Sequence, residues 1–284
     1  MHKNQPLVYK LLSMKKLLTL LFFTVALVSH AQESFFRGNN NYQAPPPPPF
    51  QAPAIVQAGL ILNLDAANPA SYPGTGSTWT NLVTRTSVAN FSLNSTISFA
   101  TSNGGVLRFA DGGWATTTSS FGRLASYTIE VWIKIAGTSG PAPNSNYSPC
   151  IFSEKYGSDK INLVLAYNRY TSPTSPHQYA AGYYNGGWNT ISTSSNTSDL
   201  NNWVHIVATY SGTTSTIYKN GQVIGTGTIG NNPDTSNLGY NIGKRWDMPD
   251  LVYGDYAIVN MYNRALSLAE IGTNFNAVKS RFGL

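Results

Sequence analysis

Two segments of this chain alternate with the two-residue period of a β-strand. In YTIEVWIKI (residues 127–135) every second residue is apolar or aromatic, and Thr, Glu, Trp and Lys stand between them. In WVHIVATY (203–210) both alternating sets are largely apolar. Because successive strand side chains point to opposite faces, the first segment predicts a strand with one face in a core. The second predicts a strand that is covered on both sides.

Similar short runs fill the chain from residue 59 onward. LILNL, VLRF, INLVLAY and YAIVNMY are rich in aliphatic, β-branched and aromatic residues, and Gly, Ser, Thr and Asn separate them. Only 11% of the residues are charged, which suits a β-rich exported protein better than a helical cytosolic one. Many short strands without interleaved helices predict an all-β fold with two antiparallel sheets packed as a sandwich.

Two local motifs predict a hairpin and a helix. Asn220-Gly221 is the residue pair favoured in a type I′ turn, where both central residues have positive φ. Ser267-Leu268-Ala269-Glu270 has the form of a capping box. Apolar residues follow that box at helical spacing: Leu268, Ile271, Phe275, Val278 and Phe282. This stripe predicts a short C-terminal helix that packs on the sandwich.

The N-terminus predicts export. From Met14 two lysines precede an apolar run, which ends in Ser29-His30-Ala31 before Gln32, as in a secretory signal peptide. We therefore expect residues 1–31 to contain a signal peptide that is cleaved between Ala31 and Gln32, with Met14 as the true translation start. The mature protein is then secreted or displayed on the cell surface. Residues 32–53 contain five consecutive prolines and predict a stiff linker. The folded domain is expected over residues 54–284.

Charge and length exclude two classes of partner. The net charge of +6 falls to +2 when the four lysines of the signal segment are removed, and the remaining basic residues are scattered. A basic footprint for nucleic acid is therefore missing, and we expect no nucleic-acid binding. No later segment approaches the roughly 18 apolar residues of a membrane helix, so we expect no membrane insertion.

His205 lies between two apolar residues, Val204 and Ile206, and a histidine in such surroundings is a candidate general base. A base needs a nucleophile and an orienting carboxylate, and the sequence has no nucleophile-elbow motif to suggest either. We interpret His205 as a structural residue of a strand. Cys150 is the chain's one cysteine and is interpreted as a buried small apolar residue.

Several of these stretches together resemble the laminin-G-like, concanavalin A-like domains of bacterial secreted or surface proteins. They are YTIEVWIKI, the pair LNNWVHIVATY and TSTIYKNGQVIG, YNIGKRW, and above all YGDYAIVNMYNRALSLAEI, and the resemblance covers about residues 59–284. It implies a jelly-roll sandwich, often calcium-bearing, that binds carbohydrate or a cell-surface protein in adhesion. A fold alone does not fix the ligand.

The same fold houses glycoside hydrolases, and those of family 16 place a Glu-x-Asp-x-x-Glu motif on one strand. The chain has no such motif and no H-E-x-x-H metal motif. We therefore expect a non-catalytic binding or adhesion module. Two alternatives stay open: a structural subunit that forms homo-oligomers in a surface filament or matrix, and, as the minority alternative, a glycoside hydrolase.

Aromatic and amide side chains in loops are the candidates for ligand binding, because sugar rings stack on aromatic faces while amides bond hydroxyls. The candidate residues are Tyr183, Tyr184, Asn185, Trp188, Trp246 and Asp247. No cofactor is required. If calcium binds, its candidate ligands are the strand-end residues Asp65, Asp111 and Asp255, and the alternative for each is a carboxylate that caps its own turn.

Overall fold

The strands of this chain fold back on one another around a shared core. The computed structural model describes residues 51 and 53–284 except 85, 87–89, 120–123, 140–148, 155–159, 168–176, 195–198, 232–237 and 246–249. The expected signal peptide and most of the expected linker lie outside the described residues. Phe50–Leu284 forms one compact unit.

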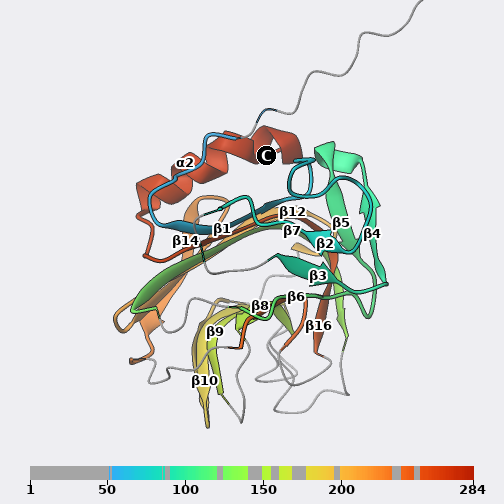
Figure 1. The fold of residues 1–284 in the computed structure, drawn as a ribbon. Helices are drawn as coiled ribbons and strands as arrows, with labels where there is room; N and C mark the ends of the chain where they lie inside the picture. Colours follow the sequence, from blue (N-terminus) through green and yellow to red (C-terminus); the bar gives the residue numbers. More distant parts are fainter. Residues whose placement is uncertain are drawn as a thin grey trace, which may run out of the picture. The chain divides into compact units, whose positions relative to one another are not determined.

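Sixteen strands in the described part of the chain form two layers (Figure 1). The first layer has the order β14-β13-β12-β7-β16, and both β1 and the β5–β4 pair join it at β16. The second layer has the order β11-β10-β9-β8-β15-β6-β3-β2. The two layers are joined by one parallel bridge between Leu251 of β16 and Cys150 of β8. The all-β sandwich with a C-terminal helix is confirmed.

The strands have the following bounds: β1 Leu60–Asp65, β2 Thr78–Trp79, β3 Phe91–Leu93, β4 Ile97–Ala100, β5 Val106–Phe109, β6 Ala115–Thr116, β7 Ser126–Ser139, β8 Cys150–Glu154, β9 Lys160–Tyr167, β10 Tyr179–Asn185, β11 Trp188–Ser192, β12 Trp203–Ser211, β13 Thr214–Lys219, β14 Gln222–Thr228, β15 Tyr240–Ile242 and β16 Leu251–Tyr262. A 3-10 turn, η1, spans Ser102–Gly104.

The alternation in β7 and β12 divides their side chains between the core and the outer face of the first layer. Ile129, Val131 and Ile133 of β7 lie in the main core, which also contains residues of the second layer such as Leu165. Trp132 belongs instead to a separate cluster under the C-terminal helix. Both faces of β7 and β12 are therefore covered, although only β12 was expected to be.

Helix α2 spans Leu268–Val278 and continues into the 3-10 turn η3, Lys279–Phe282. It lies across the outer face of the first layer (Figure 1). The predicted capping box is present, and Glu270 also binds Arg264, which lowers the pKa of the Glu270 carboxyl to about 2. The prediction is wrong for one member of the apolar stripe. Leu268, the first residue of the helix, is 52% exposed and does not pack on the sheet.

The predicted hairpin joins β13 to β14. Asn220 and Gly221 both have positive φ, as the type I′ turn requires. The Asn220 side chain accepts a hydrogen bond from the backbone N–H of His205 in β12. Within the described residues, no helix has the length and apolar character that crossing a membrane requires.

Candidate functional site

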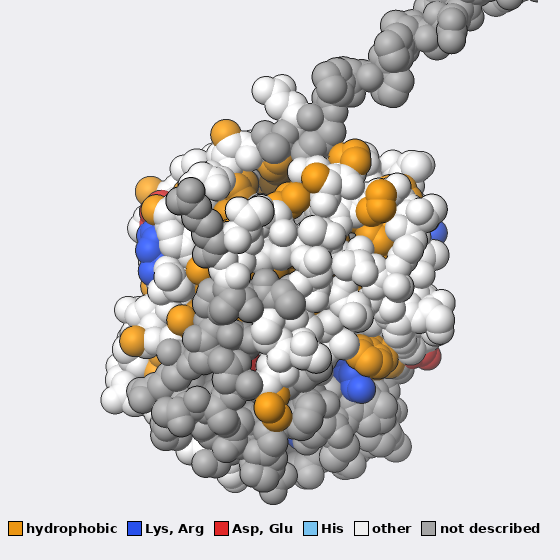
Figure 2. Space-filling model, viewed as in Figure 1, with side chains coloured by type: hydrophobic (Ala, Val, Ile, Leu, Met, Phe, Trp, Pro, Cys, Tyr) orange, Lys and Arg blue, Asp and Glu red, His pale blue; other side chains and the backbone are white. Residues whose placement is uncertain are grey.

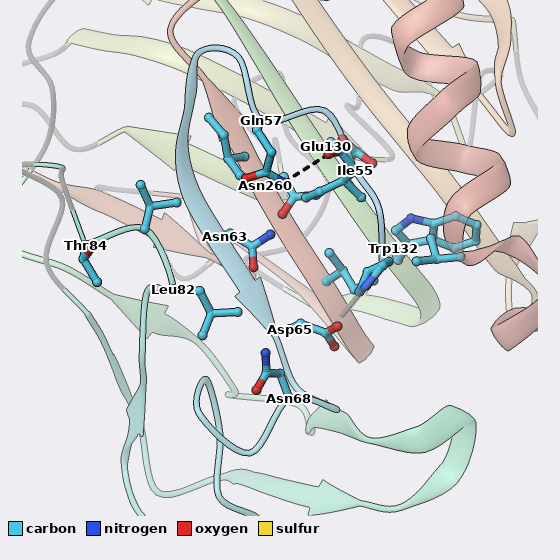
Figure 3. Close-up of a pocket in the computed structure, with 15 residues that line it drawn as sticks. Ile55, Gln57, Asn63, Asp65, Asn68, Leu82, Thr84, Glu130, Trp132 and Asn260 are labelled. Atoms are coloured by element: carbon cyan, nitrogen blue, oxygen red, sulfur yellow. Dashed lines mark hydrogen bonds between the residues drawn. The ribbon is translucent and has the colours of Figure 1, made fainter. Parts of the chain in front are cut away.

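A pocket of about 490 Å³ lies on the outer face of the first layer (Figure 3). Its floor comes from β1, β7 and β16, and Val278 of α2 contributes to one wall. Residues 53–57 and 82–84 form its rim. The volume falls in the range of about 300–1,000 Å³ that is typical of small-molecule sites.

Strand register places the polar side chains of the floor in two rows. Asn63 of β1 is paired with Asn260 of β16, which is paired in turn with Glu130 of β7. In the next row on the same face, Asp65 of β1, Ile258 of β16 and Trp132 of β7 are neighbours. Residues two apart on a strand share a face, so the six side chains form one continuous patch (Figure 3).

Four buried polar atoms of the lining residues have no hydrogen-bond partner within the described part of the chain. Both amide atoms of Asn260 are among them, although its side chain belongs to a residue that is only 1% exposed. The others are Asp65 Oδ2 and Trp132 Nε1. Buried polar groups are nearly always bonded in native proteins. The residues that line the pocket therefore hold two acceptor atoms and two donor groups that the described part of the chain leaves unbonded.

The Asp65 carboxylate is held in place through its other oxygen. Asp65 Oδ1 accepts from Arg281 Nη1 at 2.8 Å and from the backbone N–H of Ala67 at 2.9 Å. Arg281 also donates to the backbone oxygens of Asn103 and Gly105. This network orients the carboxylate and leaves Oδ2 for the pocket.

Glu130 is engaged on both oxygens. His205 Nε2 lies 2.8 Å from Oε1, and Asn274 Nδ2 of α2 donates to Oε2 at 2.7 Å. Asn274 also donates to the Tyr262 hydroxyl and accepts from the backbone N–H of Val56 at 2.8 Å. Burial and the Glu130 charge raise the pKa of the Tyr262 hydroxyl. This buried network attaches α2 and the segment around Val56 to the sheet.

Trp132 presents its edge to the pocket, because aromatic rings cover its faces. Phe282 stacks on it at a centroid distance of 4.4 Å, Phe275 at 5.7 Å, and the His205 ring lies at 4.8 Å. The faces are therefore closed to a ligand. The indole N–H is the group that Trp132 offers.

The predicted ligand residues that the structure describes lie on the other layer. Tyr183 is buried in the main core, where its hydroxyl donates to the backbone oxygen of Ile229, so its selection as a loop residue was wrong. Tyr184 and Trp188 pair across β10 and β11 with ring centroids 5.1 Å apart, and Asn185 ends β10 beside them. Both rings pack on the face of the second layer that points away from the core.

The Arg245 guanidinium lies 5.4 Å from the centroid of the Trp188 ring. Trp246 and Asp247, the remaining predicted ligand residues, lie outside the described residues. Tyr184, Asn185 and Trp188 are therefore together, but on the opposite face of the sandwich from the pocket.

The three candidate calcium ligands do not gather at one point. Asp255 binds Arg108 at 2.8 Å and has Lys134 at 3.6 Å, and Asp65 binds Arg281. Asp111 is exposed in a turn. No group of three His, Cys, Asp or Glu residues among the described ones could hold a metal ion.

The sequence reasoning missed Asn260 and the pocket. It also missed the carboxylate that binds His205, because Glu130 lies 75 positions away in the sequence. A usable signal existed in the strand parity. Asn63 and Asn260 stand at positions where the alternation of LILNLD and YAIVNMY points away from the core.

Comparison with known families gives one match. Residues 108–272 match the Laminin_G_3 family model, described as the concanavalin A-like lectin/glucanases superfamily. The match covers more than half of the chain. No curated protein matches the sequence significantly.

Several solved structures share the fold. A Trypanosoma rangeli sialidase in complex with the inhibitor DANA aligns with a TM-score of 0.54 at 19% identity, over 78% of this chain and 33% of the sialidase. Domain 4 of AbnA, a GH43 extracellular arabinanase from Geobacillus stearothermophilus, in complex with arabinotriose, aligns with a TM-score of 0.58 at 12% identity, over 76% and 98%. The binding domain of Paraclostridial Mosquitocidal Protein 1 aligns with a TM-score of 0.53 at 15% identity, over 77% of this chain and 52% of that domain's chain. The chain thus spans about a third of the sialidase, and these identities establish similarity of fold alone.

Proposed function

Because the chain belongs to the concanavalin A-like lectin/glucanases superfamily, we propose that it is an exported, non-catalytic module that binds carbohydrate in the pocket over β1, β7 and β16. The module would serve adhesion to a glycan-bearing surface. Export is supported by the signal-peptide pattern before Gln32.

The observation that carries this proposal is the Asn260 side chain. It is almost fully buried, lines the pocket, and has neither amide atom bonded within the described part of the chain. A buried amide without partners costs stability. Its presence is explained if a ligand supplies hydrogen bonds, and amides recognise sugar hydroxyls as both donor and acceptor.

The structures with a similar fold support a carbohydrate ligand. The AbnA domain was solved with arabinotriose, and the sialidase with DANA. They do not decide between binding and catalysis, because the superfamily contains lectins and glucanases.

A non-catalytic role is supported by the state of the two acidic residues in the pocket. Glycoside hydrolysis commonly uses one carboxyl group as an acid and a second as nucleophile or base. Both oxygens of Glu130 are engaged by His205 and Asn274, so this carboxylate is not free for either task. Asp65 would then have no second free carboxyl group among the described residues that line the pocket.

A glycan array probed with the purified full chain tests the proposal. Wild type is expected to bind at least one carbohydrate, and Asn260→Leu to lose at least about tenfold in affinity. Asn276→Leu is the matched control, because Asn276 is exposed on α2. Trp188→Ala probes the aromatic pair on the second layer. Loss of binding in Trp188→Ala, with binding retained in Asn260→Leu, would place the site on the second layer and contradict the pocket assignment.

The two alternatives predict different results. A structural subunit would form regular polymers in electron microscopy and size-exclusion chromatography, whereas the binding module is expected as discrete particles. A hydrolase would release reducing sugar from a polysaccharide panel, and the binding module is expected to release none.

A further inference from the structure

We infer that the ligand of this pocket is a neutral, hydroxyl-rich saccharide and that acidic sugars are excluded. The inference rests on the proposed function and adds the chemical class of the ligand. It follows from two independent properties of the pocket: its charge and its unsatisfied donors and acceptors.

The charged residues that line the pocket are both acidic. They are Asp65 and Glu130, and none of the lining residues that the structure describes is Lys, Arg or His. Arg281 binds Asp65 from outside the lining, through Oδ1, and so does not face a ligand at Oδ2. A bound carboxylate would lie near these two carboxylates in a partly buried site and find no guanidinium to pair with among the described lining residues.

Over the face in Figure 2, most of the described surface carries neither acidic nor basic side chains. This face therefore offers an acidic glycan little long-range attraction.

The unpartnered atoms call for groups that both donate and accept. Asp65 Oδ2 and Asn260 Oδ1 need donors, whereas Asn260 Nδ2 and Trp132 Nε1 need acceptors. A hydroxyl group can do either, so a sugar with neighbouring hydroxyls satisfies all four. The carboxylate group of an acidic sugar cannot donate to Asp65, and an ammonium group cannot accept from Trp132.

The covered faces of Trp132 also restrict the mode of recognition. Because Phe275 and Phe282 stack on the indole, a sugar ring cannot stack there. Affinity must come from hydrogen bonds to hydroxyls at the pocket floor. Such bonds discriminate strongly against a ligand that lacks the matching group, because the buried protein atoms are then left unpaired.

The test is a binding panel of matched neutral and acidic glycans, measured with the full chain. Galacto-oligosaccharides and oligogalacturonides of equal length are one pair, and lactose and sialyllactose are another. The expected result is binding to a neutral member, at least about tenfold weaker binding to its acidic counterpart, and loss of the neutral binding in Asn260→Leu.

Asp65→Asn tests the charge argument, with thermal unfolding as the check that the variant folds. It keeps the shape of the side chain and removes the charge, so the preference for the neutral member is expected to shrink. If Asp65→Asn does not fold, the Asn260→Leu comparison still decides.

Each outcome separates the inference from the proposed function. Preference for the acidic member, lost in Asn260→Leu, would overturn the inference and leave carbohydrate binding in the pocket intact. Neutral binding that survives Asn260→Leu would overturn the inference by placing the site elsewhere. Failure to bind any glycan of the panel would overturn the proposed function itself.

Discussion

Two buried asparagines, Asn260 of β16 and Asn274 of the helix that covers the same face, should respond to the same substitution in opposite directions. Asn274 is 0% exposed and bonds Glu130, Tyr262 and the backbone N–H of Val56. Asn260 is 1% exposed and bonds none of the described groups through its amide. Leucine has nearly the shape of asparagine without its polar atoms. The pair Asn274→Leu and Asn260→Leu therefore isolates the role of the hydrogen bonds.

The magnitudes follow from the bonds lost. Asn274→Leu removes one hydrogen bond to a buried charge, worth about 1.5–3 kcal/mol, and two neutral ones of about 1 kcal/mol each. Leucine regains a few tenths of a kcal/mol in helix propensity. The expected loss in free energy of unfolding is therefore about 3–5 kcal/mol. Asn260→Leu loses no such bond and removes a buried amide that the described groups leave unbonded, so it is expected to change stability by between zero and a gain of about 2 kcal/mol.

Urea denaturation of wild type and both variants, without ligand, measures these differences. The two variants should differ by at least about 3 kcal/mol at unchanged m-value. A loss of more than about 2 kcal/mol in Asn260→Leu would show that its amide supports the fold. The argument for a ligand at that position would then fail.

Three further predictions concern the cap, the hairpin and export. Hydrogen bonds with Arg264 are the main cause that lowers the pKa of the Glu270 carboxyl to about 2 in the folded state. The contribution of this carboxylate to stability is therefore fully present above its unfolded pKa near 4.5 and is lost as the pH falls toward 2. Melting temperatures of wild type and Glu270→Gln should differ at pH 7 and converge near pH 2, and a gap independent of pH would contradict this. Gly221→Ala should cost about 1–2 kcal/mol in urea denaturation, since φ is +78° and the added Cβ would lie 3.4 Å from the Phe275 ring; an unchanged midpoint would refute the turn assignment. N-terminal sequencing of protein exported by a bacterial host should begin at Gln32, and retention of residues 1–31 would contradict the signal peptide.

Much of the architecture could be predicted because it depends on local pattern. The alternation of β7 and β12, the Asn220-Gly221 turn and the Ser267–Glu270 capping box each involve residues close in sequence. Their physics is that of side-chain direction, positive φ and unsatisfied helix amides. The turn and the capping box are confirmed, and so is the division of strand side chains between two faces, except that the outer face of β7 is also covered.

The pocket could not be predicted in the same way because long-range register assembles it. Asn63 and Asn260 are directly paired although 197 positions separate them, and Glu130 joins the row from a third strand. Tyr183 shows the converse error. The residues that follow Tyr183 resemble a loop in the sequence, but β10 extends to Asn185. The alternation of the strand therefore places the Tyr183 ring in the core.

Isothermal titration of the strongest-binding neutral saccharide into wild type and Asn260→Leu tests the central claim most directly. The account predicts a single site in wild type and at least about tenfold weaker binding in the variant, with the variant at least as stable as wild type in urea. Equal affinity in the two proteins would contradict the claim that this pocket binds the carbohydrate.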